Sequence, residues 1–225
     1  QASERARAPH LQIDRGEGNW LIDLDGNRYL DGTASLWTNV RGHDDPDLSE
    51  ALRGQLNRLP HSTYLGLAHS PATQLARKLA DITPSALEVS FFSDNGSCAV
   101  EVALKMSFQF WQMTGRPEKN KIAAMKGAYH GDTLGAMSVG DEGPFSERFR
   151  PWCFEVERFV APKCLESGGT LHEADENKSL ADLKDLLDRE GSCLAAVVLE
   201  PSVQGAAGMK QQPPGFVSKV ASLCK

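Results

Sequence analysis

The sequence predicts an α/β protein with a mainly parallel sheet, because short apolar runs alternate with amphipathic helical patterns. In the second half of the chain the expected strands are 121–125, 155–160 and 193–199. A helical pattern at 179–190, with leucines on one stripe, separates the last two. Strands joined through helices pair in parallel, so this order of segments predicts crossover connections.

The first half of the chain predicts a hairpin followed by two amphipathic helices. Two apolar runs within 18–31 flank the turn Asp25-Gly26-Asn27, which is typical of a β-hairpin. Residues 33–42 are polar and aromatic and are expected to form a loop. The helices are expected at 46–59 and 70–82, each with a proline near its start and an apolar stripe.

The stretch 87–111 connects the two halves and predicts a strand, a tight turn and a helix. The apolar run Val89–Phe92 is expected to be the strand, and 93–97 the turn. The helix then continues to Trp111 without glycine or proline. Apolar residues cover so much of its surface that we expect the helix to be buried inside a larger domain.

The turn before this helix has the composition of a phosphate site. Asp94, Asn95 and Ser97 are residue types that cap helix N-termini, and Gly96 permits a close approach to the backbone. Free N–H groups and the helix dipole would then favour an anion. An ordinary capped helix explains the same residues. Since G-x-G-x-x-G and the P-loop motif are both absent, the expected ligand is a single phosphate.

Three polar segments follow predicted strands and are expected to meet in one crevice. They are the turn 94–97, the Tyr129-His130 loop and Glu200. In open α/β sheets, ligands bind beyond the carboxyl ends of the strands. Trp37, in the loop 33–42, is either a further pocket wall or a packed side chain.

Composition excludes several classes of function. The chain has 225 residues, of which 40% are hydrophobic and 24% charged, and its net charge of −6 comes from scattered groups. We therefore expect neither a nucleic-acid partner nor a membrane partner. The five cysteines are widely spaced and form no C-x-x-C pair, so a disulfide framework and a zinc site are not expected. This usage indicates a reducing compartment, the cytoplasm or the mitochondrion.

Both ends of the sequence suggest a portion of a longer polypeptide. The chain starts with Gln1, and an amphipathic pattern at 216–224 runs to the end without a stop signal. We therefore expect truncation at the C-terminus.

Several segments together resemble the class III aminotransferases, which depend on pyridoxal 5'-phosphate (PLP). The segments lie in the order typical of the family, at 29–37, 92–103, 129–138 and 200–209. The resemblance implies a fold-type-I PLP-dependent transferase. Residues 1–60 would be an N-terminal segment of the small domain, and 61–225 the first part of the large PLP-binding domain.

The resemblance also implies roles for particular residues. Gly96 and Ser97 would hold the PLP phosphate, and Tyr129 would stack on the pyridine ring and border the substrate. Glu200 would lie near the cofactor, although strand-end carboxylates also serve as turn or cap groups. His130 would support the loop and carries no assigned acid–base role.

Segments 135–138 and 204–209 favour the branch of the family in biotin biosynthesis, which converts 8-amino-7-oxononanoate to 7,8-diaminononanoate. Leu36 and Trp37 would line the substrate pocket. Members that use S-adenosyl-L-methionine as amino donor typically have two adjacent tryptophans here, so Leu36 leaves adenosylmethionine and lysine both open as donors.

The resemblance implies a homodimer acting on small molecules, and it places the catalytic lysine and the acid paired with the pyridine nitrogen after residue 225. No catalytic residue is therefore expected in this chain, and Lys126, the one lysine near the expected crevice, is more simply a surface residue. Two alternatives stay open: another class III aminotransferase acting on an ω-amino acid, and a non-catalytic partial domain.

Overall fold

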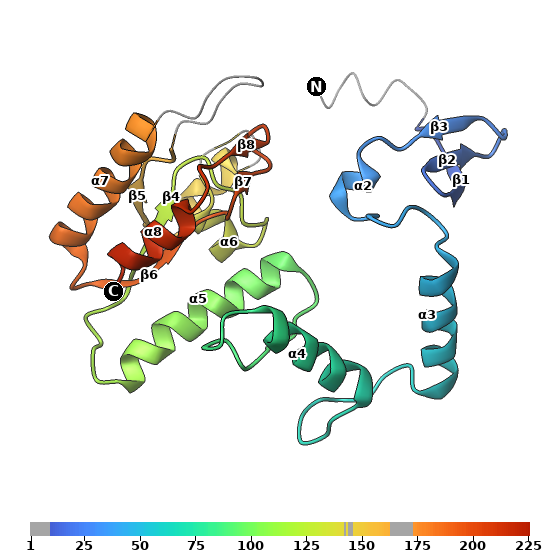
Figure 1. The fold of residues 1–225 in the computed structure, drawn as a ribbon, viewed down its shortest axis with the longest axis horizontal. Helices are drawn as coiled ribbons and strands as arrows, with labels where there is room; N and C mark the ends of the chain where they lie inside the picture. Colours follow the sequence, from blue (N-terminus) through green and yellow to red (C-terminus); the bar gives the residue numbers. More distant parts are fainter. Residues whose placement is uncertain (1–9, 142, 144–145, 163–172) are drawn as a thin grey trace. The chain divides into compact units, whose positions relative to one another are not determined.

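The computed structural model describes residues 10–141, 143, 146–162 and 173–225, and it divides into two compact units. The first unit ends at Ser90 and the second begins at Phe91. Figure 1 shows the elements of both units. The division falls later than the expected boundary at residue 60, whose assignment to small and large domains stays a prediction.

The first unit opens with an antiparallel sheet of three strands, in the order β1-β2-β3 (Figure 1). The strands are β1 (Ile13–Glu17), β2 (Trp20–Asp23) and β3 (Arg28–Leu30). The predicted hairpin is β2–β3, and its turn is held by the Asp23 carboxylate, whose Oδ1 accepts from the backbone N–H of Asn27 at 2.8 Å. Strand β1 was not predicted, because Arg15 and Glu17 interrupt its apolar pattern.

The segment expected as a loop at 33–42 contains α2 (Ala34–Trp37), a single left-handed turn. All four of its residues have positive φ, from 47° to 68°. An L-residue in this conformation costs roughly 1–2 kcal/mol because Cβ crowds the following carbonyl oxygen. The turn therefore needs support from outside its own backbone.

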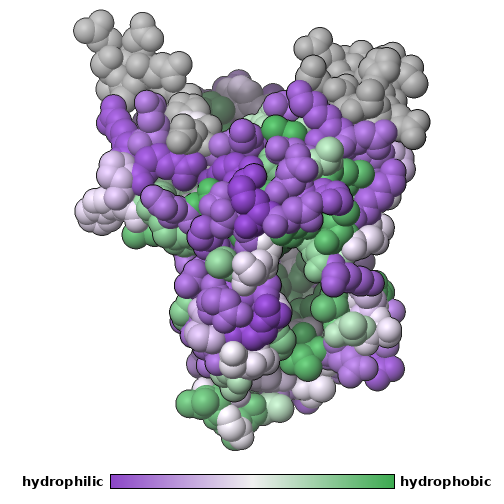
Figure 2. Space-filling view, turned by 90° about the vertical axis from the view of Figure 1, so that its left-hand side faces the viewer, coloured by the Kyte–Doolittle hydropathy of each residue, from purple (hydrophilic) through white to green (hydrophobic). Residues whose placement is uncertain are grey.

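Helices α3 (Pro46–Arg58) and α4 (Ser70–Ile82) confirm the two predicted helices of the first unit. Asp45 caps α3 by accepting from Leu48 N, and His69 caps α4 by accepting from Ala72 N. Neither helix has a buried residue, and the leucine stripe of α3 is exposed. Apolar side chains also reach the surface in Figure 2, where they are green.

The predicted strand Val89–Phe92 is wrong, since the structure assigns no strand to these residues. Val89 is 93% exposed and Phe91 64% exposed. A strand needs a neighbouring strand for its backbone hydrogen bonds, and no described strand pairs with this segment. Its apolar, β-branched composition therefore indicated strand propensity without a partner.

The second unit contains the predicted parallel sheet, in the order β5-β4-β6 (Figure 1). Its strands are β4 (Lys121–Met125), β5 (Glu157–Phe159) and β6 (Leu194–Val198), and all three match predicted strands. A short antiparallel pair, β7 (Val203–Gln204) and β8 (Lys210–Gln211), was not predicted.

Side chains of β4 point alternately to two apolar clusters, which makes the second unit a three-layer structure. Ala123 and Met125 belong to a cluster with α7 (Glu173–Glu190) and α8 (Phe216–Leu223). Ile122 and Ala124 belong to a cluster on the other face, against which α5 (Gly96–Met113) packs. Helix α7 starts at Glu173, six residues before the helical pattern predicted at 179–190. Residues 163–172, including Cys164, lie outside the described residues.

Burial of α5 is less complete than expected. Val100 and Leu104 pack against the sheet, and the indole Nε1 of Trp111 donates to the carbonyl of Ala195 at 2.8 Å. Met106 and Phe108 are 47% and 49% exposed. One face of the predicted apolar helix is therefore covered, and the other is open.

A short buried helix, α6 (Leu134–Val139), is held at both ends by charged side chains. At its N-terminus the Glu101 carboxylate accepts from the backbone N–H groups of Gly135, at 2.7 Å, and Ala136, at 3.3 Å. At its C-terminus Arg158 donates to the carbonyls of Ser138, Val139 and Gly140. Each charge lies where the helix dipole favours it.

Arg150, in the 3₁₀ helix η1 (Glu147–Trp152), also donates to the α6 carbonyls of Met137 and Gly140. The helix α6 is thereby fixed directly after the loop that carries Tyr129.

Candidate functional site

The structure brings three of the predicted site segments together in the second unit. The N-terminus of α5, the loop 129–132 after β4 and Glu200 after β6 are joined by direct hydrogen bonds. All three follow the expected order of elements in the chain, although the segment before α5 is not a strand. This convergence is the candidate site.

The N-terminus of α5 is capped as predicted. The Asn95 side chain accepts from Cys98 N at 2.9 Å, which uses one of the free N–H groups of the first turn. A Cβ placed on Gly96 would meet no atom within 4 Å, and the φ of this residue is not positive. The local conformation therefore does not require a glycine at position 96. The lack of a side chain leaves the backbone at the start of α5 accessible.

Ser97 touches the loop that follows β4. Its Oγ accepts from the backbone N–H of Asp132 at 3.2 Å, and its own hydroxyl proton remains available to an acceptor. Gly131 has a φ of +128°, and a Cβ there would collide with the Ser97 side chain. Glycine at 131 is thus required for the loop to pack against α5.

Tyr129 is held at both ends and leaves its ring accessible. Its backbone N–H donates to Oε2 of Glu200 at 3.0 Å, and its phenol donates to Oδ2 of Asp132 at 3.0 Å. Burial, followed by the hydrogen bond to Asp132, raises the pKa of Tyr129. The phenol is therefore protonated at neutral pH, and the residue as a whole is 47% exposed.

Glu200 acts on the backbone. Its second oxygen, Oε1, accepts from Gly205 N at 3.1 Å, so the two carboxylate oxygens connect the Tyr129 loop to the residue directly after β7. These contacts are those of a strand-end carboxylate that organises turns. A direct contact between Glu200 and a cofactor stays a prediction.

His130 is half-buried beside this network. Burial lowers the pKa of its imidazole, and its buried Nε2 has no hydrogen-bond partner. A neutral ring is consistent with the loop-supporting position expected for it. Lys126, which follows β4 directly, is exposed as expected, and its carbonyl accepts from Gln204 Nε2 at 2.8 Å.

The predicted substrate residues lie in the first unit, on the left-handed turn α2. Leu36 is 75% exposed and Trp37 55% exposed. Trp37 is therefore more than half exposed within the described part of the first unit, and both interpretations of this residue, a pocket wall and a packed side chain, stay open. Its role as a pocket wall stays a prediction.

Asp31 supports the turn from the end of β3. Its carboxylate accepts from Ser35 N at 3.1 Å and from Ser35 Oγ at 2.8 Å, and it pairs with His43 Nε2 at 2.9 Å. These bonds, led by the backbone N–H of Ser35, lower the pKa of Asp31 to about 2.

This lowered pKa predicts a pH-dependent stability. Because the folded pKa lies below the unfolded value, the stabilisation by Asp31 is complete above about pH 4 and is lost as the pH falls toward about 2. Asp31→Asn should therefore lower Tm near neutral pH, with a difference from the wild type that shrinks in this window. Thermal melts from about pH 6 to about pH 2, with Asp14→Asn as the exposed control, measure it. A difference that stays constant contradicts the prediction.

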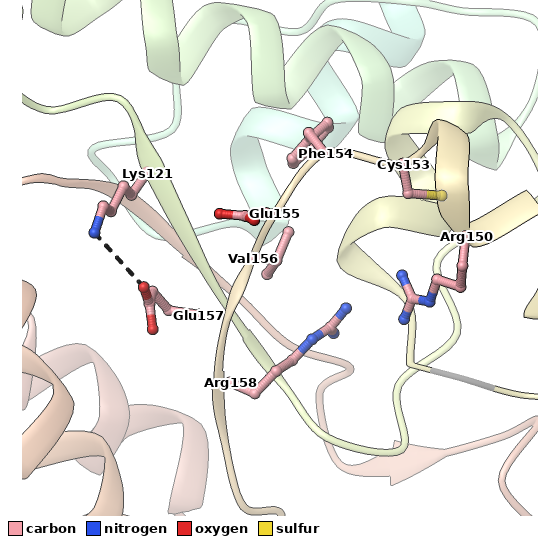
Figure 3. A pocket seen from close by; sticks show the side chains of 8 residues that line it. All are labelled: Lys121, Arg150, Cys153, Phe154, Glu155, Val156, Glu157 and Arg158. Atoms are coloured by element: carbon pink, nitrogen blue, oxygen red, sulfur yellow. Dashed lines mark ion pairs between the residues drawn. The ribbon is translucent and has the colours of Figure 1, made fainter.

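A separate cavity of about 570 Å³ lies at the other end of the sheet (Figure 3). Lys121, at the start of β4, lines it together with the segment that leads into β5. Its cations are already engaged: Lys121 pairs with Glu157 at 3.7 Å, and Arg158 donates to carbonyls of the α6 region. Both side chains are therefore already paired within the protein, and no ligand is assigned to this cavity.

Two residues important to the site were not predicted as such. Asp132 connects Ser97 to Tyr129, and Glu101 fixes the helix after the loop. Asp132 lies within the segment 129–138 that carries the family resemblance, but no role was predicted for it. In the part of the chain that the structure describes, no cluster of three His, Cys, Asp or Glu could hold a metal ion, and no helix has the length and apolar character needed to cross a membrane.

Comparison with known families and proteins finds aminotransferases. The family model Aminotransferase class-III matches residues 2–225. An adenosylmethionine-8-amino-7-oxononanoate aminotransferase from Geobacter sulfurreducens is 46% identical, covering 100% of this chain and 50% of that protein. A protein of the same name from Staphylococcus aureus is 40% identical, covering 95% of this chain and 48% of the relative. The chain thus spans about half the length of these relatives.

Solved structures agree on the fold. A crystal structure of adenosylmethionine-8-amino-7-oxononanoate aminotransferase from Methanocaldococcus jannaschii matches with a TM-score of 0.89 at 38% identity, covering 100% of this chain and 48% of that one. An (S)-enantioselective omega-transaminase from Thermomicrobium roseum matches with a TM-score of 0.87 at 35% identity, covering 99% and 49%. A PLP-bound amine transaminase from an uncultivated Pseudomonas species matches with a TM-score of 0.87 at 30% identity, covering 100% and 51%.

Proposed function

Since this chain belongs to the class III aminotransferases, we propose that its second unit holds the phosphate and the ring of PLP in an aminotransferase. The observation that carries the proposal is the junction of Ser97, Tyr129 and Glu200 through hydrogen bonds. A helix N-terminus alone would bind an anion of any kind. An aromatic side chain fixed next to it adds a surface for a flat ring.

The residues present fit the phosphate group. Around Gly96 there is open space at the start of α5, where an anion can approach the backbone N–H groups. The Ser97 hydroxyl can donate to a phosphate oxygen while its oxygen keeps the bond from Asp132 N. Gly96 and Ser97 would therefore hold the phosphate.

The residues also fit the ring. Tyr129 presents an accessible aromatic surface, and its backbone and phenol are both anchored. A side chain fixed in this way loses little further freedom on binding, which favours affinity. Asp132 and Glu200 would orient Tyr129, and Glu200 would act through the backbone.

We propose that the reaction transfers an amino group to the ketone of 8-amino-7-oxononanoate and yields 7,8-diaminononanoate. When bound, PLP supplies the electron sink and carries the amino group between donor and acceptor. The names of the relatives from Geobacter sulfurreducens and Staphylococcus aureus support this choice of acceptor. Leu36 and Trp37 would border the substrate, and adenosylmethionine and lysine are both candidate donors.

The omega-transaminase of Thermomicrobium roseum supports a second candidate, a class III aminotransferase that acts on other ω-amino compounds. Both candidates use small-molecule substrates.

The proposed assembly is a homodimer. The proposed compartment is the cytoplasm or the mitochondrion, and the four described cysteines are free thiols, which fits a reducing environment.

The test is an assay of the complete natural polypeptide that carries this sequence. The protein is incubated with PLP, 8-amino-7-oxononanoate and either adenosylmethionine or lysine, and 7,8-diaminononanoate is quantified by mass spectrometry. We expect product with one of the two donors. Conversion of 4-aminobutyrate or ornithine without any 7,8-diaminononanoate would instead support the second candidate.

A further inference from the structure

The left-handed turn α2 is the most strained segment of the described chain. Ala34, Ser35, Leu36 and Trp37 have φ values of 47°, 49°, 61° and 68°, and none of them is a glycine. Backbone bonds within the turn, such as Trp37 N to Thr33 O at 2.8 Å, close it locally. They do not remove the crowding at Cβ, so contacts from other elements must select this conformation.

Asp31 provides the first of these contacts. The backbone N–H and the hydroxyl of Ser35 both donate to its carboxylate, one to each oxygen. The Asp31 side chain is only 7% exposed. The Asp31 carboxylate therefore holds Ser35, the second residue of the turn, through two hydrogen bonds directly before Leu36 and Trp37.

His43 provides the second contact, and it connects Asp31 to the sheet of the first unit. Its Nε2 lies 2.9 Å from Asp31 Oδ2, and its Nδ1 lies 3.1 Å from Asn39 Nδ2, just after the turn. Its backbone pairs with Gly18, between β1 and β2, through bonds of 3.1 and 2.6 Å. A Cβ on Gly16 would collide with the His43 side chain, so this side chain packs directly on β1.

We propose that Asp31 and His43 are positioning residues that hold the left-handed turn and thereby fix where Leu36 and Trp37 stand. This inference rests on the proposed function, in which these two side chains border the substrate. The sheet β1-β2-β3 is the rigid support, since Asp31 follows β3 and His43 is bonded to the β1–β2 connection. Loss of the hydrogen bonds made by Asp31 and His43 should weaken substrate binding without changing the cofactor site.

The first test follows Trp37 directly by fluorine NMR of the complete polypeptide labelled with 5-fluorotryptophan. The resonance that disappears in Trp37→Phe identifies Trp37. Asp31→Ala should shift or broaden this resonance and leave those of Trp111 and Trp152 in place. Ser35→Ala, which removes only the hydroxyl bond, should cause a smaller shift. The control Asp14→Ala removes an exposed aspartate of β1 and should move nothing.

The second test is kinetic. Asp31→Ala and His43→Gln should raise the KM of the substrate that Trp37 borders about tenfold, with a change of kcat below about twofold and an unchanged Kd for PLP. If Asp31→Ala does not fold, Asp31→Asn retains one acceptor for Ser35 N and serves in its place.

The outcomes separate the inference from the function. If the Trp37 resonance does not move in the Asp31 and His43 variants, the inference that these residues hold the turn is wrong. A moved resonance with unchanged KM values overturns the link to substrate. An inactive wild-type protein would overturn the proposed function, and the fluorine spectra would still decide whether Asp31 and His43 hold the turn.

Discussion

Gly96→Asp is expected to lower the affinity for PLP about 100-fold, or about 2.7 kcal/mol. The new side chain has open space and no unfavourable φ, so it would fit without collision. Its carboxylate would stand at the first residue of α5, where the proposal places the phosphate dianion. Titration of the apo-protein with PLP, followed by absorbance or tyrosine fluorescence, measures the effect.

The same substitution should leave the fold intact. An acidic residue in the first turn of a helix is favourable by about 0.3–1 kcal/mol, so the unfolding free energy should stay equal or rise slightly. Gly96→Asn is the matched control, because it has nearly the same shape without the charge. Equal PLP affinities of the Asp and Asn variants would contradict a phosphate at this position.

Glu101→Ala is expected to lower the free energy of unfolding by about 2–4 kcal/mol. It removes the carboxylate that accepts from Gly135 N and Ala136 N, and it leaves these N–H groups unsatisfied in a helix whose residues 135–139 are buried. Urea unfolding of the complete polypeptide, monitored by circular dichroism, gives the difference.

Two further variants show whether this loss comes from the cap. Glu101→Gln keeps an oxygen acceptor and should cost less than the alanine variant. Gln109→Ala changes an exposed position of the same helix and should have little effect. If Glu101→Ala were no more destabilising than Gln109→Ala, the capping of α6 by Glu101 would be wrong.

The parallel sheet of the second unit could be predicted because its signals are local. Residues 122–125 and 193–199 are apolar runs of strand length, and each is bounded by polar residues. The cap at Asn95 could be predicted for the same reason. Val89–Phe92 shows the limit of such signals, since its residues favour a strand and no described strand pairs with them.

The left-handed turn could not be predicted, because its residues include none of the glycines or asparagines that usually adopt positive φ. Its support comes from His43, which is twelve residues from Asp31 in the chain. Such contacts depend on the assembled sheet and leave no local pattern.

The meeting of the three site segments could be predicted from a general property of α/β sheets. The hydrogen bonds that join these segments could not. The strand-end rule placed Tyr129 and Glu200 near one another. It gave no sign that Asp132 connects Ser97 to Tyr129, since this contact spans 35 residues. The carboxylate of Glu200 also turned out to bind backbone N–H groups, which residue type alone does not reveal.

The most direct test of the phosphate and ring site is a crystal structure of the complete polypeptide with PLP. We predict density for the phosphate at the N–H groups of Gly96 and Ser97, with the pyridine ring against Tyr129. A phosphate found instead in the cavity beside Lys121 and Arg158, with no density at the start of α5, would contradict the assignment.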